Sequence, residues 1–211
     1  MTAITHHVPD ALLAAYATGN LPEAYALVVA AHISLCLECR AAYEAHQVGG
    51  GAVLETVGAE AVSEDLKSNV LDLLDAPYRP QPTYPRAGVY PGPVMEALKG
   101  KPPSWKSVGL GVRQSILSSG RDGSVRLLYI PPGQAMPDHS HNGLELTLVL
   151  QGSFSDSTGQ FGVGDLEVAD HDLEHTPTAD PGAPCICLAA TDAPLRFRSL
   201  VPRLLQPLFR I

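Results

Sequence analysis

The residues best suited to chemistry in the first part of the chain lie between His32 and Cys39, in the order H-I-S-L-C-L-E-C. On a continuous helix His32 and Cys36 share one face, and Cys39 follows one turn later. An imidazole and two thiols at this spacing are typical of a metal site. Structural zinc usually has four ligands, so we expect the fourth to be His6 or His7, which precede the first helical pattern. The competing interpretation is a helix with two buried free cysteines and a hydrogen-bonded histidine.

A second set of possible metal ligands lies in the segment G-Q-A-M-P-D-H-S-H-N-G-L-E. His139, His141 and Glu145 have the same parity, so on an extended chain their side chains leave one face and can converge inside a barrel. A fourth ligand is expected at His175, with His171 as its rival. Three imidazoles and one carboxylate fit zinc, manganese, iron, nickel or copper. The competing interpretation is a barrel that keeps these residues without binding a metal.

Two further cysteines, Cys185 and Cys187, lie in the strand-like run C-I-C-L-A-A. Their i, i+2 spacing places both sulfurs on one face and makes a disulfide between them awkward. We expect these two cysteines to act as small hydrophobic residues in the barrel wall. The alternative is that they form a redox-reactive pair that faces the second metal site.

The elements that must position the first site are helical. The patterns predict a helix over residues 10–17, a second one that begins near Pro22 and is apolar almost all round, and a third from about Leu37 to about Gly49. Three consecutive glycines are expected to break or kink that third helix. So short a bundle gains little from its own core, and a bound metal would supply much of its folding free energy.

A further helix over residues 64–75 is predicted to be amphipathic. It presents one apolar face, formed by Leu66, Val70, Leu73 and Leu74. This face either completes the helical bundle or binds a partner.

The chain changes character after a proline-rich stretch. Residues 77–93 hold six prolines and are predicted to be a semi-rigid linker. Short alternating runs bounded by turn residues follow it and indicate an antiparallel β-barrel or jelly roll. We therefore predict two domains, an all-α metal-binding bundle over residues 1–76 and an all-β domain over residues 94–211.

Charge and composition restrict the partners. Residues 1–85 hold three basic and ten acidic side chains, a net charge of -7, whereas the remaining residues carry -1. Nucleic-acid binding needs a basic surface, so we expect no direct contact with nucleic acid and a basic protein as the partner. The chain has no run of eighteen apolar residues and no signal-peptide pattern, which predicts a cytoplasmic protein without a membrane span and with reduced thiols.

The motifs resemble two known families. Gly133, His139, His141, Glu145 and Gly152 fit the first cupin motif, G-x5-H-x-H-x3-E-x6-G, and Gly164, Asp165 and His175 resemble the second one loosely. The segments H-H-V-P-D-A-L-L-A-A-Y and A-H-I-S-L-C-L-E-C-R are similar to the zinc-binding anti-sigma domain. The whole chain resembles the ChrR-type anti-sigma factors, which join these two domains.

This resemblance implies the sites and the function. Its zinc ligands fall on His7, His32, Cys36 and Cys39, and its cupin ligands, for zinc or another divalent transition metal, fall on His139, His141, Glu145 and His175. It implies a protein that inhibits a sigma factor of the extracytoplasmic-function type, with a cupin domain that senses oxidative stress such as singlet oxygen or peroxide. The alternative is a metal-dependent cupin enzyme, a dioxygenase or isomerase, with an accessory zinc domain. The cupin domain is also a possible site of dimerisation.

Overall fold

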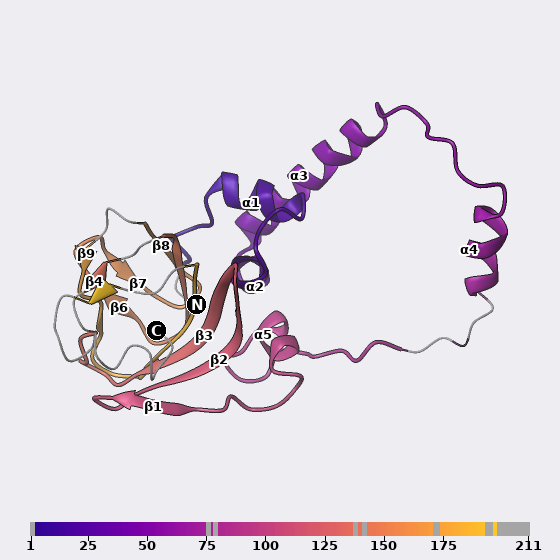
Figure 1. Cartoon of the computed structure of the whole chain (residues 1–211). Coiled ribbons are helices and arrows are strands. Elements are labelled where there is room, and N and C mark those ends of the chain that lie inside the picture. The colour runs from indigo at the N-terminus through magenta and orange to yellow at the C-terminus, as the bar shows by residue number, and fades with distance from the viewer. Residues whose placement is uncertain are drawn as a thin grey trace.

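The computed structural model describes residues 3–74, 77, 80–136, 139–140, 143–170, 174–192 and 196–197; for 139–140, 174–175 and 196–197 it describes the backbone alone. Helices dominate the first half of the chain and strands the second (Figure 1). The helices are α1 (Asp10–Ala17), α2 (Glu23–Ile33), α3 (Leu37–Leu54), α4 (Leu66–Leu74) and α5 (Gly92–Ala97).

The first three helices begin, and the first of them ends, where local chemistry predicts. Pro9 and Pro22, both with extended backbone, immediately precede α1 and α2. Proline suits this position because it has no N–H that the start of a helix would leave unsatisfied. Gly19 follows α1 with a φ of 71°, a left-handed conformation that glycine adopts without strain. Cys36 caps α3, and its Sγ accepts a hydrogen bond from the amide of Cys39.

The prediction that the third helix stops near Gly49 is wrong. α3 continues through the three glycines to Leu54. Each glycine inside a helix costs only about 0.5–1 kcal/mol relative to alanine, so a run of three lowers helix propensity without forbidding a helix. The exposed, glycine-rich half of α3 extends away from the rest of the molecule (Figure 1).

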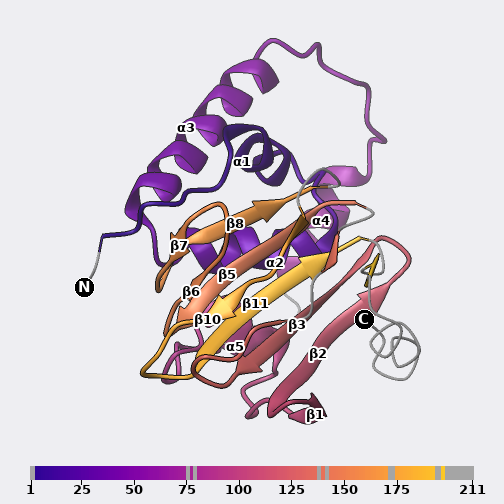
Figure 2. The same cartoon turned by 90° about the vertical axis from the view of Figure 1, so that its left-hand side faces the viewer.

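The second half of the described chain is an antiparallel β domain. Its strands are β1 (Lys106–Gly109), β2 (Val112–Gly120), β3 (Gly123–Ile130), β4 (His139–Ser140), β5 (Glu145–Gln151), β6 (Phe154–Ser155), β7 (Gln160–Phe161), β8 (Leu166–Ala169), β9 (Glu174–His175), β10 (Thr178–Ala179), β11 (Cys185–Thr191) and β12 (Arg196–Phe197). The main sheet has the order β1-β2-β3-β11-β5-β8 (Figure 2), and two small sheets have the orders β10-β6-β7 and β12-β4-β9. The predicted antiparallel architecture is confirmed.

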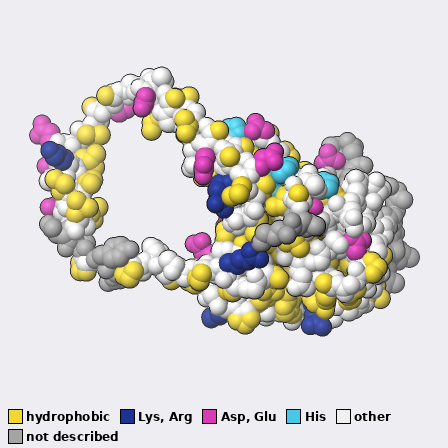
Figure 3. Space-filling view, turned by 180° about the vertical axis from the view of Figure 1, so that it is seen from behind, with side chains coloured by type: hydrophobic (Ala, Val, Ile, Leu, Met, Phe, Trp, Pro, Cys, Tyr) yellow, Lys and Arg dark blue, Asp and Glu magenta, His cyan; other side chains and the backbone are white. Residues whose placement is uncertain are grey.

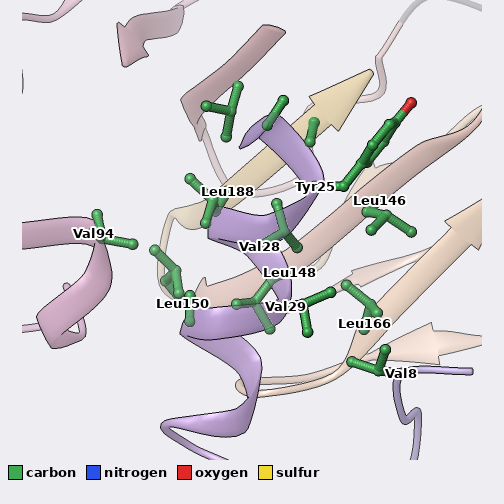
Figure 4. Close-up of a cluster of buried hydrophobic side chains, with 14 of the residues drawn as sticks. Val8, Tyr25, Val28, Val29, Val94, Leu146, Leu148, Leu150, Leu166 and Leu188 are labelled. Carbon is green, nitrogen blue, oxygen red and sulfur yellow. The ribbon is translucent and has the colours of Figure 1, made fainter. Parts of the chain in front are cut away.

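Among the described residues the helical part shares its core with the sheet, so the predicted all-α bundle is not seen as a separate unit. Val28 and Val29 of α2 are fully buried in one cluster with Leu146, Leu148 and Leu188 of the main sheet (Figure 4). The hydroxyl of Tyr25 also donates a hydrogen bond of 2.7 Å to the carbonyl of Leu144, beside the same sheet. Because α2 is apolar on all sides, it can contact the helices and the sheet at once. The proposed domain limits, 1–76, 77–93 and 94–211, remain a prediction.

The other helices have different environments. α4 contains no buried residue and stands apart from the rest of the molecule (Figure 1).

Within the described part of the chain, no single helix is long and apolar enough to cross a membrane. α2 and α3 meet that length and composition only as a pair, and a bend of 119° separates them.

Candidate metal centre

Four side chains of the predicted zinc site converge at the end of α2. The ligand atoms of His7, His32, Cys36 and Cys39 all lie within 4.8 Å of one another. His32 Nε2 is 3.3 Å from Cys39 Sγ, and His7 Nδ1 is 3.4 Å from Cys36 Sγ and 3.5 Å from Cys39 Sγ. His32, Cys36 and Cys39 are buried.

The three N–S distances fit a tetrahedral zinc ion. Zn–N bonds of about 2.0–2.1 Å and Zn–S bonds of about 2.3 Å give a tetrahedron with edges of roughly 3.3–3.8 Å. The three measured distances fall within that range. Two thiols and two imidazoles without an open position are the donor set of a structural zinc site rather than a catalytic one.

The turn between α2 and α3 positions three of the ligands. His32 lies in the last turn of α2, and its carbonyl accepts hydrogen bonds from the amides of Leu35 and Cys36, both of 2.8 Å. This tight turn places Cys36 at the start of α3 and Cys39 one turn further on. The close sequence spacing therefore corresponds to a helix–turn–helix corner and not to one continuous helix.

The N-terminal segment decides which of the two adjacent histidines joins the group. The His6 ring lies 4.4 Å from the ring of Phe161, centre to centre, and the His6 carbonyl accepts a hydrogen bond from the amide of Leu166. His7 is the neighbour that reaches the cysteines. Its Nε2 lies 3.5 Å from a carboxylate oxygen of the exposed Glu38. A carboxylate at this position would orient the ring and increase its basicity as a ligand.

Burial prepares these groups for a metal. It lowers the pKa of His32 to about 4, helped by the neighbouring His7, so the ring is neutral at physiological pH and can bind a metal. Burial, together with Cys36, raises the pKa of the Cys39 thiol to about 11. The metal-free thiol therefore carries a proton, and a metal ion would have to displace it.

The second predicted site is described only in part. Strands β4 and β9 pair so that His139 and His175 lie directly opposite one another. Glu145 opens β5, is partly buried, and accepts a hydrogen bond of 3.1 Å from the Thr147 hydroxyl. His141 and its rival candidate His171 lie outside the described residues.

One buried cation beside Glu145 was not anticipated from the sequence. Arg126 on β3 is only 6% exposed and donates hydrogen bonds to Gln114 (3.1 Å) and to Ser124 (2.8 Å). Burial lowers its pKa, and the charge of Glu145 opposes that effect. The strand V-R-L-L-Y-I offered a signal, because Arg126 has the parity of inward-facing Leu128.

The remaining two cysteines face the interior of the β domain. Cys185 and Cys187 are almost fully buried in a cluster with Phe154 and Phe161, and their sulfurs are 3.4 Å apart as free thiols. Their hydrogen bond, together with burial, raises the pKa of Cys187 well above its usual value. A thiol in that condition is a poor nucleophile while the fold stays closed.

Comparison with known proteins places this geometry in a family. Residues 97–193 match the family of the ChrR cupin-like domain. The anti-sigma-E factor ChrR of Cereibacter sphaeroides is 53% identical over 216 residues, which cover 99% of this chain and 99% of the relative. The fold and the first site thus combine a candidate metal centre in the helical part with a cupin-like domain, and the chain belongs to the ChrR family of anti-sigma factors.

One solved structure agrees with this assignment. A crystal structure of Rhodobacter sphaeroides SigE in complex with the anti-sigma ChrR contains a chain that is 50% identical and superposes with a TM-score of 0.81. The match covers 90% of this chain and 100% of that chain. An RmlC-like cupin from Ralstonia eutropha matches 46% of this chain and 68% of its own, at 20% identity and a TM-score of 0.42, which is too distant to carry an argument.

Proposed function

We propose that this protein is an anti-sigma factor that binds and inhibits a sigma factor of the extracytoplasmic-function type. The observation that carries this proposal is identity along the full chain with an anti-sigma factor, together with an overall structure like that of the ChrR chain solved with SigE. That similarity includes both the helical part and the cupin-like domain. Cupin enzymes that share only the second half would not explain the first.

The binding surface that we assign to sigma is the exposed apolar surface of α3 and α4. Exposed hydrophobic side chains continue from the middle of α3, through the segment that connects the two helices, to the end of α4. They are Val48, Val53, Leu54, Val57, Val62, Leu66, Val70, Leu71, Leu73 and Leu74. Hydrophobic side chains of α4 face the opening between this helix and the rest of the molecule, with charged side chains on the outside (Figure 3). An exposed apolar surface of this extent indicates an interaction site.

Charge complements this surface. The -7 net charge of residues 1–85 favours association with a basic protein surface, and sigma factors carry basic surfaces where they face DNA. Acidic residues beside the apolar stripe would speed association and orient the partner, while the apolar stripe supplies affinity. The same charge disfavours a direct complex with nucleic acid.

The metal centre would hold the sigma-binding part in shape. In this proposal His7, His32, Cys36 and Cys39 bind a structural zinc ion that fixes the corner between α2 and α3. Circular dichroism of the full chain before and after chelation tests this role. An unchanged spectrum and an unchanged unfolding temperature would contradict it.

The cupin-like domain is proposed to trigger release under oxidative stress, through a divalent metal held by His139, His141, Glu145 and His175. Two features are compatible with such a metal site: His139 lies opposite His175 in the pairing of β4 with β9, and Glu145 opens β5 of the main sheet. Cys185 and Cys187 are candidates for a redox role only if the domain opens, since both are buried. The cytoplasm is the compartment in which such a regulator would meet sigma.

The decisive experiment uses the full chain and a purified sigma factor of the extracytoplasmic-function type. Wild type is expected to form a stable complex by size-exclusion chromatography and to inhibit sigma-dependent transcription. The double variant His141→Ala, Glu145→Ala should still bind sigma but fail to release it under singlet oxygen. Loss of sigma binding in that variant would rule out the separate roles. Substrate turnover by a wild-type protein that binds no sigma would instead support a cupin enzyme.

A further inference from the structure

The N-terminal segment that carries the zinc ligand His7 is bound to the cupin-like domain by one carboxylate. Oδ1 of Asp165 accepts hydrogen bonds from the amide of Thr5 (2.7 Å) and from the amide of His6 (2.9 Å). The hydroxyl of Thr5 donates a third, longer bond of 3.3 Å. Asp165 thus holds the two residues that immediately precede His7.

Asp165 is itself firmly held. It is 5% exposed, and its other oxygen accepts a hydrogen bond of 2.8 Å from the amide of Gly162. Burial alone would raise its pKa, but the amides of Thr5, Gly162 and His6 outweigh that effect and hold the pKa below its usual value. The carboxylate is therefore ionised across the physiological range and can act as a permanent acceptor.

Apolar and backbone contacts on both sides of Asp165 also hold the N-terminal segment against the cupin-like domain. We call this contact region the Asp165 junction. The Leu166 amide donates to the His6 carbonyl at 3.1 Å, so the segment pairs with the start of β8. Ile4 covers Gly164, where an added Cβ would come within 2.6 Å of the Ile4 side chain. Gly164 also has a φ of 95°, so the tight turn and the close approach both require glycine.

The four candidate ligands come from separate parts of the chain. His7 belongs to the N-terminal segment, whereas His32, Cys36 and Cys39 lie in α2, at the cap of α3 and in α3. The metal centre is therefore not held by the helices alone.

The turn at residues 162–165 leads directly into β8 of the cupin-like sheet. β8 begins at Leu166 and pairs with β5, in which Leu148 lies opposite Leu166 and Glu145 lies opposite Ala169. One short strand thus joins the Asp165 junction to Glu145, one of the predicted cupin ligands. A shift of β8 relative to the helices would strain the bonds to Thr5 and His6.

We propose that Asp165 is a positioning residue that fixes His7 in the zinc site from the cupin-like domain, and so makes retention of zinc depend on the state of that domain. This inference rests on the proposed zinc centre and adds a specific physical connection between it and the cupin-like domain. Removal of the carboxylate frees the segment before His7 while all four ligands remain.

The test measures the release of cobalt(II) from the full chain. Absorption from thiolate-to-cobalt charge transfer reports on Cys36 and Cys39 only, because the predicted cupin ligands include no cysteine. With excess chelator, Asp165→Ala should lose this absorption about tenfold faster than wild type, at the lower end of the losses found when a group that orients a metal ligand is removed. Asp165→Asn should change the rate in the same direction by less, and it serves if the alanine variant does not fold.

Asp180→Ala is the matched control. Asp180 is also a carboxylate of the β domain with several hydrogen bonds, from Ser153 (2.6 Å), Ser155 (2.8 Å) and Gln160 (2.8 Å), but these lie within that domain. Its release rate should stay within about twofold of wild type. Equal rates for wild type and a folded Asp165 variant, or equal acceleration by Asp180→Ala, would overturn the proposal.

Two further measurements separate this inference from the proposed function. Hydrogen exchange at the amides of Thr5, His6 and Leu166 should quicken in Asp165→Ala but not in Asp180→Ala. Unchanged exchange at these amides would count against the junction. Failure of the wild-type chain to bind sigma, with the cobalt result intact, would overturn the proposed function and leave the positioning role standing.

Discussion

α2 and α4 are both rich in apolar residues, yet they have opposite environments. α2 reads E-A-Y-A-L-V-V-A-A-H-I and buries Val28, Val29 and His32 completely. α4 reads L-K-S-N-V-L-D-L-L and buries nothing, with Leu73 71% exposed. A helix that is apolar all round must be enclosed by its own protein, whereas a helix with a single apolar stripe can leave that stripe for a partner.

Because of this difference, we expect α2 to govern the stability of the fold and α4 to govern the binding of sigma. α2 supplies a large share of the core between the helices and the sheet, and it also carries the zinc ligand His32. α4 contributes little to the folded state and is available to sigma. Substitutions in the two helices should therefore affect different measurements, and the following predictions are arranged from the largest expected effect to the smallest.

The largest effect is expected from a charge placed in α2. Val29→Asp would place a carboxylate at a fully buried position in an apolar cluster, and should lower the free energy of unfolding by more than about 4 kcal/mol. Chemical denaturation followed by circular dichroism measures this change. A loss below about 1 kcal/mol would show that α2 is not enclosed as described.

The buried end of α2 should make stability depend on pH. The pKa of His32 is about 4 in the folded, metal-free chain, below the ordinary histidine value of 6.5 that the unfolded chain is expected to have, so the unfolded chain binds more protons between these values. Stability should therefore fall as pH drops from about 6.5 to about 4, by up to about 1.4 kcal/mol per pH unit.

Denaturation of the metal-free protein at several pH values tests this dependence. The variant His32→Gln has no titrating group at this position, so its stability should change less over the same interval. Equal slopes for the variant and wild type would assign the pH dependence to other groups.

A charge placed in α4 should leave stability unchanged and weaken binding. Val70→Asp and Leu73→Asp alter exposed side chains, so the free energy of unfolding should change by less than about 0.5 kcal/mol. Affinity for sigma should fall by about thirtyfold or more if these residues are anchors of the interface. Calorimetric titration measures the affinity, and Ser68→Asp, which adds the same charge on the opposite, polar side of the helix, is the control. Unchanged affinity in both apolar variants would remove α4 from the binding surface.

The smallest effect is expected between these two helices, in the glycine run of α3. A Cβ added at Gly50 meets nothing within 4 Å, so Gly50→Ala should stabilise the helix by about 0.5–1 kcal/mol. Thermal unfolding and helical content by circular dichroism measure this gain. A lower helical content in the variant would show that the glycines interrupt α3, as the sequence pattern predicts.

The sequence predicted the elements better than their environments. The starts of α1 and α2, the amphipathic α4 and the antiparallel strands all follow from proline positions and local periodicity. The end of α3 was predicted wrongly, because a glycine run lowers helix propensity without forbidding a helix. The shared core was also missed: periodicity shows that α2 has to be covered, but not by what.

In the first metal site, too, the sequence predicted one part and not the other. His32, Cys36 and Cys39 are close in sequence, so their spacing alone predicted a common site. The choice of His7 over His6 could not be made from spacing, because adjacent residues of an extended segment point in different directions and only a fixed neighbour selects between them.

The amino-acid sequence by itself determined the helices, the strands, the acidic first part and three of the four ligands around the proposed zinc ion, because each depends on short-range periodicity and spacing. The tertiary structure decided which histidine lies beside the cysteines, the enclosure of α2 and the contacts of Asp165. These depend on which surfaces meet: Asp165 is 160 residues from Thr5 along the chain, and only packing of the turn before β8 against the N-terminal segment brings its carboxylate within 2.7 Å of the Thr5 amide.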